Sequence, residues 1–478
     1  MMTPSTLLST ALLIMLLAPF APTPIARADI FKWEYINPAD PSQGKRQSSM
    51  LAPDGAGVTA EPGADLSNRN LTMAYLIGAN LSATLVCDEF SGCNYVGSVN
   101  LSGTNLSQAD LTSAKLFLAN LSGANLAAAE VRAADFSQTG ITASQLYSTA
   151  SYQAHDLTRI SLGGANLTGV NLAGQNLAGA SFWGTTLTNA NFNQAQLIGA
   201  NFYYATFSGA DLRQANATDA AFGGASLANA NLGQANLTGA NFNGATLTLA
   251  NLSGAQLTGA QIANANFNGA GLTPAQIYTT ASYQNGDLSG IGLANTDLTG
   301  ADFSNKQLSS ADYAADFSNA NLSQANLTNA TLSGICDEFN CYPTLLNANL
   351  TGAEIRGANL TFSGITAAQL ASTASYQAHD LSGVVLARSN FPGINLAGQN
   401  LTSADFSGAT LSNANISGAN LANGDLSFAT LTAAKLTGAI VRGTRFDYSG
   451  ITLAQLYSTA SYTAHDLTGI RLGSSNLA

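Results

Sequence analysis

A large apolar residue recurs at every fifth position from Leu66 onward, and this period constrains the fold more than any other feature of the sequence. Ala or another small residue usually stands two places before this apolar centre, and Asn, Asp, Ser or Thr stands one place before it. A typical run of centres is Leu232, Leu237, Phe242, Leu247, Leu252, Leu257, Ile262 and Phe267. A period of five fits neither the helical period of 3.6 nor the strand period of 2.0. It predicts a solenoid, in which each turn buries the face of its neighbour.

The repeated unit has the form A-[ND]-[LF]-[ST]-x, as in Ala240-Asn241-Phe242-Asn243-Gly244. On this motif the chain resembles the pentapeptide-repeat proteins over residues 65–478, as an exported bacterial member. The resemblance implies an all-β solenoid, a right-handed quadrilateral β-helix in which four pentapeptides make one square coil. The central Leu or Phe and the preceding small residue would point inward. At a strand spacing of about 4.8 Å, roughly 19 coils would form a rod on the order of 90 Å long.

A longer motif interrupts the repeat four times, near residues 142–152, 273–283, 366–376 and 452–462. Each copy contains Thr-x-x-Gln, which is typical of a capping box at the start of a helix. The pairs are Thr142 with Gln145, Thr273 with Gln276, Thr366 with Gln369, and Thr452 with Gln455. Each copy therefore predicts one helix of two to three turns, with these residues as its caps. The centres jump by eleven residues across it, as from Leu146 to Leu157, so the helices divide the solenoid into blocks or mark bends.

The first 28 residues have the features of a signal peptide. The apolar run from Leu7 to Phe20 is shorter than the roughly 20 residues that a spanning helix needs, and Ala26-Arg27-Ala28 matches an A-x-A cleavage site. Cleavage after Ala28 predicts a secreted, periplasmic or cell-surface protein with no stable membrane span. A short membrane anchor is the alternative, because the first residues lack Lys and Arg. Residues 29–64 lack the repeat and predict an N-terminal cap or a flexible spacer.

The four cysteines occur as two close pairs in places where the five-residue rhythm is lost. In an exported protein such pairs predict local disulfides, here Cys87–Cys93 and Cys336–Cys341. A metal site of Cys and acidic residues is the alternative, although the spacing is not a usual zinc pattern. Pairing between the two loops would require the rod to fold back on itself.

The sequence offers little catalytic chemistry. His155, His379 and His465 each precede an Asp after a helical insertion, but the second copy has Asn285-Gly286-Asp287 instead. This substitution favours a structural role at the helix exit over a nucleophile–base pair. Asp residues are too sparse for repeated Ca²⁺ sites. We therefore predict no enzyme activity and no catalytic, cofactor-binding or metal-binding residues.

Composition narrows the function classes. Charged residues are only 9% of the 478, and the net charge is −11, so we expect no nucleic-acid partner. The repeat itself creates many Asn-x-Ser/Thr sequons, and a eukaryotic secreted chain would be glycosylated along its faces; we therefore expect a bacterial source. The main hypothesis is a non-catalytic exported scaffold or protein-interaction rod with an unknown protein or polysaccharide partner. A DNA-mimicking inhibitor of a type II topoisomerase is an alternative drawn from the resemblance. A polysaccharide-binding or polysaccharide-cleaving β-helix protein is another.

The last coil carries no cap in this sequence, which stops at Ala478, three centres after the fourth insertion. An uncapped coil exposes unpaired backbone groups. We therefore expect either an end-to-end homodimer or a further C-terminal segment.

Overall fold

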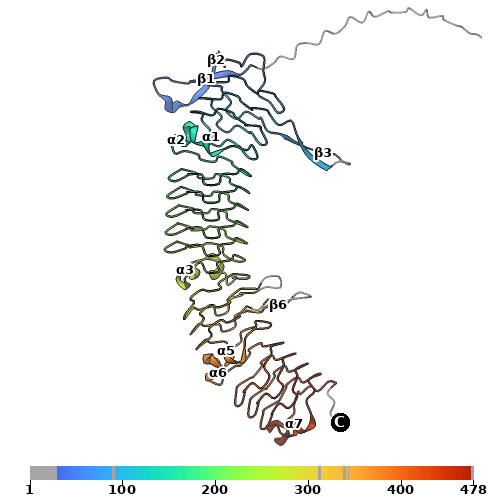
Figure 1. The fold of residues 1–478 in the computed structure, drawn as a ribbon. Coiled ribbons are helices and arrows are strands. Elements are labelled where there is room, and N and C mark those ends of the chain that lie inside the picture. The colour runs from blue at the N-terminus through green and yellow to red at the C-terminus, as the bar shows by residue number, and fades with distance from the viewer. Residues whose placement is uncertain (1–28, 89–91, 310–313, 337–340, 343, 475–478) are drawn as a thin grey trace, which may run out of the picture.

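The computed structural model describes residues 29–88, 92–309, 314–336, 341–342 and 344–474, and the repeats among them form one continuous stack of coils (Figure 1). Parallel backbone bridges join residues 20 apart, such as Asn176 and Gln196. The Leu177 N–H donates to the Gln196 carbonyl at 2.8 Å, and the Gln196 N–H donates to the Gln175 carbonyl at 2.9 Å. Because each repeat has five residues, four repeats complete one coil. The predicted signal peptide (1–28) and the end of the chain at Ala478 lie outside the described residues.

Each corner of a coil is a tight turn, which explains the composition of the repeat. The N–H of Ala180 donates to the carbonyl of Leu177, three residues earlier, at 2.9 Å. The residue before the donor, Gly179, has a φ of +66°, as the third position of a type II turn requires. The Oδ1 of Asn176 accepts from the N–H of Ala178 at 3.2 Å, so the Asn side chain supports the turn from within.

The central residues and the small residues before them fill the interior of the stack. Residues at the same place on successive coils form columns, and one column is built of fully buried phenylalanines. These rings stack nearly parallel, with centroids 5.1, 5.1 and 5.0 Å apart, in the order Phe182, Phe202, Phe222 and Phe242. The inward assignment of the centres is therefore confirmed for this block.

The segment before the repeats forms an antiparallel hairpin of β1 (Phe31–Tyr35) and β2 (Lys45–Leu51), with a 3₁₀ helix η1 (Pro41–Gln43) between them. The hairpin bonds directly to the first coil. The Trp33 N–H donates to the Met73 carbonyl at 3.0 Å, and the Tyr75 N–H donates to the Phe31 carbonyl at 2.8 Å.

Insertions lengthen individual coils without breaking the stack. Bridged residues are 20 apart in a plain coil but 35, 26 and 28 apart where an insertion intervenes, at Asp65–Asn100, Asp135–Ser161 and Asn321–Asn349. The 35-residue coil holds a hairpin of β3 (Thr84–Asp88) and β4 (Gly92–Val96), and the 28-residue coil holds β5 (Ile335–Cys336) and β6 (Cys341–Tyr342). The 26-residue coils hold the helical insertions. The rod runs on through each of them in Figure 1.

Each helical insertion is a pair of short helices, so the prediction of a single helix was wrong in this respect. The pairs are α1 (Ala143–Ser148) with α2 (Ala150–Gln153), α3 (Pro274–Tyr278) with α4 (Ala281–Gln284), α5 (Ala367–Ser372) with α6 (Ala374–Gln377), and α7 (Leu453–Tyr457) with α8 (Ala460–Thr463). In the first pair Thr149 has extended backbone, with φ −73° and ψ 149°. Its buried hydroxyl donates to the Leu146 carbonyl at 2.7 Å and accepts from the Tyr152 N–H at 3.1 Å. One threonine therefore ends the first helix and caps the second.

Candidate functional site

The predicted capping residues form both halves of the box in all four insertions. The boxes join Thr142 with Gln145, Thr273 with Gln276, Thr366 with Gln369, and Thr452 with Gln455. In the first, the Gln145 N–H donates to Thr142 Oγ1 at 3.2 Å, and the Thr142 N–H donates to Gln145 Oε1 at 3.0 Å. Each box therefore caps only the first helix of its pair, α1, α3, α5 or α7, and not the whole insertion that the sequence predicted.

The four glutamines are more than caps, and the prediction of a capping role alone was incomplete. The Gln145 amide nitrogen also donates to the carbonyls of Leu121 (2.8 Å) and Ala124 (3.1 Å) in the preceding coil. The other three copies repeat this pair of bonds. Gln276 donates to Leu252 and Ala255 at 2.8 and 3.1 Å, Gln369 to Leu345 and Ala348 at 2.9 Å each, and Gln455 to Leu431 and Ala434 at 2.8 and 2.9 Å. Each glutamine thus clamps its helix to the backbone of the preceding coil.

Paired tyrosine hydroxyls anchor the first two insertions to the following coil. The Asn171 N–H donates to the Tyr147 hydroxyl at 2.7 Å, and the Tyr152 hydroxyl donates to the Asn171 carbonyl at 2.8 Å. The two hydroxyls thus satisfy the N–H and the carbonyl of Asn171, which a preceding repeat would bond in a plain coil. Burial raises the pKa of the Tyr152 hydroxyl above its usual value. Tyr278 and Tyr283 bind Asp302 in the same way.

The histidines after the helices occupy a special backbone position. His155, His379 and His465 have φ values of +56°, +55° and +55°, and Gly286 holds the equivalent place in the second copy with a φ of +78°. A left-handed residue is the usual way to end a helix, and glycine adopts that conformation without cost. The replacement of histidine by glycine thus follows from the backbone.

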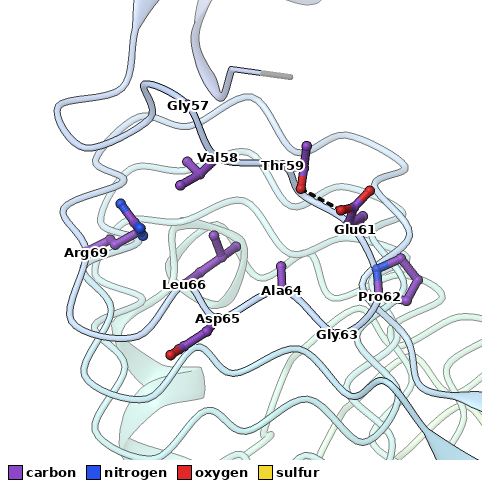
Figure 2. Close-up of a pocket in the computed structure, with 10 residues that line it drawn as sticks. All are labelled: Gly57, Val58, Thr59, Glu61, Pro62, Gly63, Ala64, Asp65, Leu66 and Arg69. Carbon is purple, nitrogen blue, oxygen red and sulfur yellow. Dashed lines mark hydrogen bonds between the residues drawn. The ribbon is translucent and has the colours of Figure 1, made fainter. Parts of the chain in front are cut away.

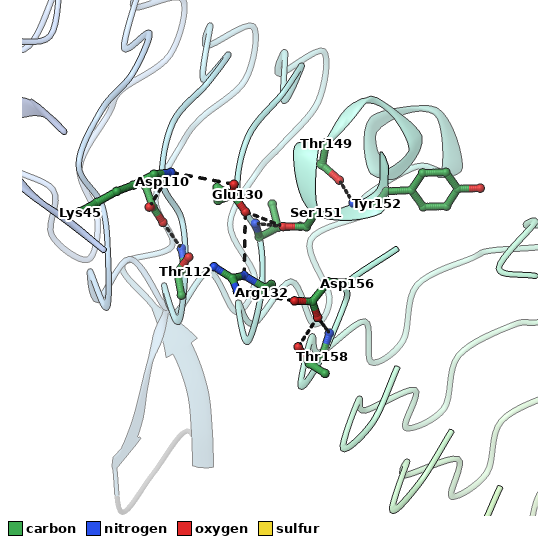
Figure 3. Close-up of polar contacts among 11 residues, drawn as sticks. Lys45, Asp110, Thr112, Glu130, Arg132, Thr149, Ser151, Tyr152, Asp156 and Thr158 are labelled. Atoms are coloured by element: carbon green, nitrogen blue, oxygen red, sulfur yellow. Dashed lines mark hydrogen bonds and ion pairs between the residues drawn. The ribbon is translucent and has the colours of Figure 1, made fainter. Parts of the chain in front are cut away.

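A line of ion pairs joins the N-terminal hairpin to the first insertion (Figure 3). Lys45 lies 3.1 Å from Asp110, whose side chain is 5% exposed, and 3.9 Å from Glu130. Arg132 bridges Glu130 at 3.9 Å and Asp156 at 3.5 Å. The arginine arrangement recurs at Glu354, Arg356 and Asp380. Sequence reasoning missed this network, although the Glu-x-Arg spacing one coil before two insertions was a visible signal.

A cavity of about 260 Å³ lies beside the first repeats and is lined partly by Glu61, Asp65 and Arg69 (Figure 2). The Thr59 hydroxyl donates to Glu61 Oε1 at 2.8 Å. A hydrogen bond from the Ser67 side chain lowers the pKa of Asp65 below its usual value. The polar groups point in different directions in Figure 2 rather than converging on one point, so we assign this cavity no ligand.

The first cysteine pair staples a hairpin that projects from the rod (Figure 1). Cys87 and Cys93 face each other across β3 and β4 and form a disulfide. About half of each apolar side chain is exposed at four positions of this hairpin, Leu85, Val86, Tyr95 and Val96. Cys336 and Cys341 face each other across β5 and β6, but their side chains lie outside the described part, so that disulfide stays a prediction.

The hairpin of β3 and β4 and the hairpin of β5 and β6, called the first and second hairpins below, leave the stack of coils at the same column. The backbone hydrogen bonds between successive coils connect Leu81, which precedes β3, through Phe182 and Phe202 to Leu332, which precedes β5. We call the turns that follow this column the aromatic edge. Trp183, Tyr203, Tyr204, Phe428 and Tyr448 all occupy turns of this edge.

Among the described residues, the exposed aromatic side chains of the plain repeats all lie on the aromatic edge. Trp183 is 51% exposed, Tyr204 65%, Phe428 63% and Tyr448 58%. Within the described residues, every other exposed aromatic side chain belongs to the N-terminal hairpin, to β4 or to the helical insertions. Tyr204, Phe428 and Tyr448 have φ values of +59°, +60° and +57°, a conformation that bulky residues rarely adopt. The Phe428 and Tyr448 rings stack on each other at 4.9 Å.

In the described part of the chain, three or more His, Cys, Asp or Glu residues do not gather anywhere as a metal site would require. Over the same residues, no helix is long and apolar enough to cross a membrane.

A family model described as pentapeptide repeats (8 copies) matches half of the chain. The matched residues are 97–126, 156–194, 184–216, 195–234, 218–254, 235–273, 313–336, 380–418 and 411–447. No curated protein sequence matches the chain.

Several solved structures of repeat proteins are similar to it. HetL, a pentapeptide repeat protein involved in heterocyst differentiation regulation from the cyanobacterium Nostoc, has 25% identity and a TM-score of 0.27; the match covers 63% of this chain and 96% of that one. Rfr23 from the cyanobacterium Cyanothece has 28% identity and a TM-score of 0.15, over 24% and 91% of the two chains. A pentapeptide repeat protein from the Arabidopsis thaliana thylakoid lumen has 37% identity and a TM-score of 0.13, over 21% and 66%. At TM-scores this low, the superpositions support no argument about function.

Proposed function

The chain belongs to the pentapeptide repeat family, and on that premise we propose that it is an exported, non-catalytic rod that binds a partner along its aromatic edge. One observation supports this proposal above the others. The β3–β4 and β5–β6 hairpins lie on the same edge as the exposed rings of Trp183, Tyr204, Phe428 and Tyr448. Exposed aromatic side chains are common anchors at binding surfaces. We take the coils to be square and to wind to the right, as is usual in this family.

The partner is a protein or a polysaccharide outside the cytosol. The signal-like segment of residues 1–28 and the disulfide in the first hairpin favour an oxidising compartment. The titratable side chains support a structural role, since Lys45, Asp110, Glu130 and Arg132 form ion pairs along the wall.

The two alternatives are less well supported. A DNA mimic needs dense negative charge, whereas this chain has 27 acidic residues in 478 against one phosphate per about 1.7 Å of duplex. A polysaccharide-cleaving enzyme needs a pair of carboxyl groups flanking the bond that it breaks. The ion pairs instead set acidic side chains against Lys45, Arg132 and Arg356.

Fractionation of the source cells tests this proposal. The chain should leave the cytosol and stay with the cell envelope or the extracellular material through mild washing. The double variant Tyr204→Gly with Phe428→Gly should be washed off more readily, because it removes two rings from the edge. Leu249→Gly is the matched control, since Leu249 is 63% exposed and has a φ of +58° on a different column. A cytosolic chain, or equal retention of all three proteins, would contradict the proposal.

A further inference from the structure

We propose that the turns carrying Trp183, Tyr203 and Tyr204 bind a neutral polysaccharide. This inference rests on the proposed function, because it assigns a ligand class to one stretch of the aromatic edge.

The three aromatic residues lie on two adjacent coils. The Gly164 N–H donates to the Trp183 carbonyl, and the Gly184 N–H donates to the Tyr203 carbonyl, both at 2.9 Å. The Tyr204 N–H donates to the Gly223 carbonyl at 3.1 Å. Going along the edge, the successive turns are Gly163-Gly164, Trp183-Gly184, Tyr203-Tyr204 and Gly223-Gly224. The aromatic stretch is therefore bounded on both sides by turns that have no side chains.

Both tyrosine rings lie against the diglycine turn that follows them. A Cβ atom at Gly223 would be 2.0 Å from Tyr203 Cε1, and one at Gly224 would be 2.6 Å from Tyr204 Cε1. Each ring thus rests with one side on bare backbone. Because Tyr204 is 65% exposed, much of its remaining surface is open to solvent. The Asn241 amide donates to the Tyr203 hydroxyl at 3.2 Å and holds that ring in place.

The backbone at Tyr204 is unfavourable for a bulky residue. Its φ of +59° falls in the left-handed region, where glycine fits freely and a tyrosine does not. The same turn position holds Gly184 on one neighbouring coil and Gly224 on the other. Leu249 is equally exposed and has the same backbone conformation, so the ligand is assigned from the aromatic ring and its neighbours and not from the backbone alone.

The lack of charged residues around these turns favours a neutral ligand. The sequence has no Asp, Glu, Lys, Arg or His from Ile160 to Ala210, and the polar side chains there are amides and hydroxyls. An acidic polysaccharide or a nucleic acid would find no cation in this stretch to pair with its charges. A neutral sugar fits, because its C–H face can stack on an aromatic ring while its hydroxyls bond to amides and hydroxyls. Trp183, 51% exposed, offers a second open ring one coil away.

Affinity electrophoresis of the purified chain from Asp29 onward tests the inference. Native gels would contain hydroxyethyl cellulose, laminarin, glucomannan or dextran as neutral probes, and polygalacturonate or heparin as acidic ones. We expect at least one neutral probe to retard the protein, with little effect of added salt. Trp183→Ala and Tyr204→Gly should each weaken that retardation about fivefold or more, whereas Leu249→Gly should migrate like the unaltered chain. Tyr204→Gly also relieves the backbone, so its melting temperature should not fall and a loss of binding cannot be attributed to unfolding.

Three results would overturn the inference: no retardation by any neutral probe, retardation by the acidic probes alone, or retardation that both ring variants retain in full. The fractionation experiment above separates this inference from the proposed function. If the edge variants leave the envelope but no neutral probe binds, the aromatic edge still binds a partner and only the ligand class is wrong.

Discussion

Replacing Gln145 with Glu should distinguish a simple helix cap from a clamp between helix and wall. Glutamate can replace glutamine in a capping box, since either side chain accepts the Thr142 N–H. It cannot donate to the carbonyls of Leu121 and Ala124, which the glutamine amide reaches at 2.8 and 3.1 Å. A cap alone therefore predicts no loss of stability in Gln145→Glu, whereas a clamp predicts a loss.

The expected magnitude follows from these contacts. A cap alone predicts that Gln145→Glu is neutral or stabilises α1 by about 0.3–1 kcal/mol, because a negative charge favours a helix N-terminus. The clamp predicts the loss of two hydrogen bonds, about 1–3 kcal/mol in total, and a new repulsion between oxygens. The net loss of local stability should be about 1–2 kcal/mol. Gln145→Ala, which removes cap and clamp together, should lose about 2–4 kcal/mol.

Hydrogen–deuterium exchange at the amides of α1 and α2 is the appropriate assay, because a long repeat protein need not unfold in one step. Gln194→Glu is the control, since this exposed glutamine lies in a plain turn and its side chain bonds to Gln214; its effect should stay below about 0.5 kcal/mol. The deficit of Gln145→Glu should shrink in acid, where the protonated carboxyl can donate once. Unchanged or greater protection in Gln145→Glu at neutral pH would refute the clamp.

Three further predictions concern the whole chain. Intact-mass measurement on exported material should give a protein cleaved after Ala28. A protein that keeps residues 1–28 would instead favour the alternative that this segment is a membrane anchor. Leu247→Arg, at a fully buried centre, should cost several kcal/mol, whereas Thr248→Arg should change the stability by less than about 0.5 kcal/mol; similar melting of the two would contradict the inward assignment. Non-reducing peptide mapping should find Cys336 joined to Cys341, and free thiols or a link to the first hairpin would count against this pairing.

The interior of the rod could be read from the sequence because it depends on local spacing. Leu247 repeats the pattern of its neighbours, and the box of Thr142 with Gln145 needs only four residues to be recognised. The break at Thr149 was missed because Thr-Ala-Ser-Tyr is a second, weaker cap inside a segment that already looks helical. The clamp on Leu121 was missed because the bonded carbonyls lie more than twenty residues away.

The aromatic edge could not be predicted, because it depends on the length of every coil between its members. Trp183 and Phe428 fall on one edge only if the coils of 20, 24, 26 and 28 residues between them are counted correctly. Those lengths depend on the number of repeats in a coil, which is four, and on how many residues each insertion adds. The five-residue period alone does not tell how many repeats make one coil.

Bridged residues in a plain coil are 20 apart. Genetic recombination that adds or removes 20 residues would therefore change the length of the rod by one whole coil. Within the described residues, the parallel backbone bridges of a coil reach only the coils directly before and after it. Duplicating or deleting twenty residues between Leu157 and Leu272 would therefore add or remove one layer. Every feature beyond that point would move by about 4.8 Å and keep its own surroundings. The distance from Trp183 to the second hairpin can thus be reset in increments of one coil, in the manner of a ruler, while neither site is redesigned.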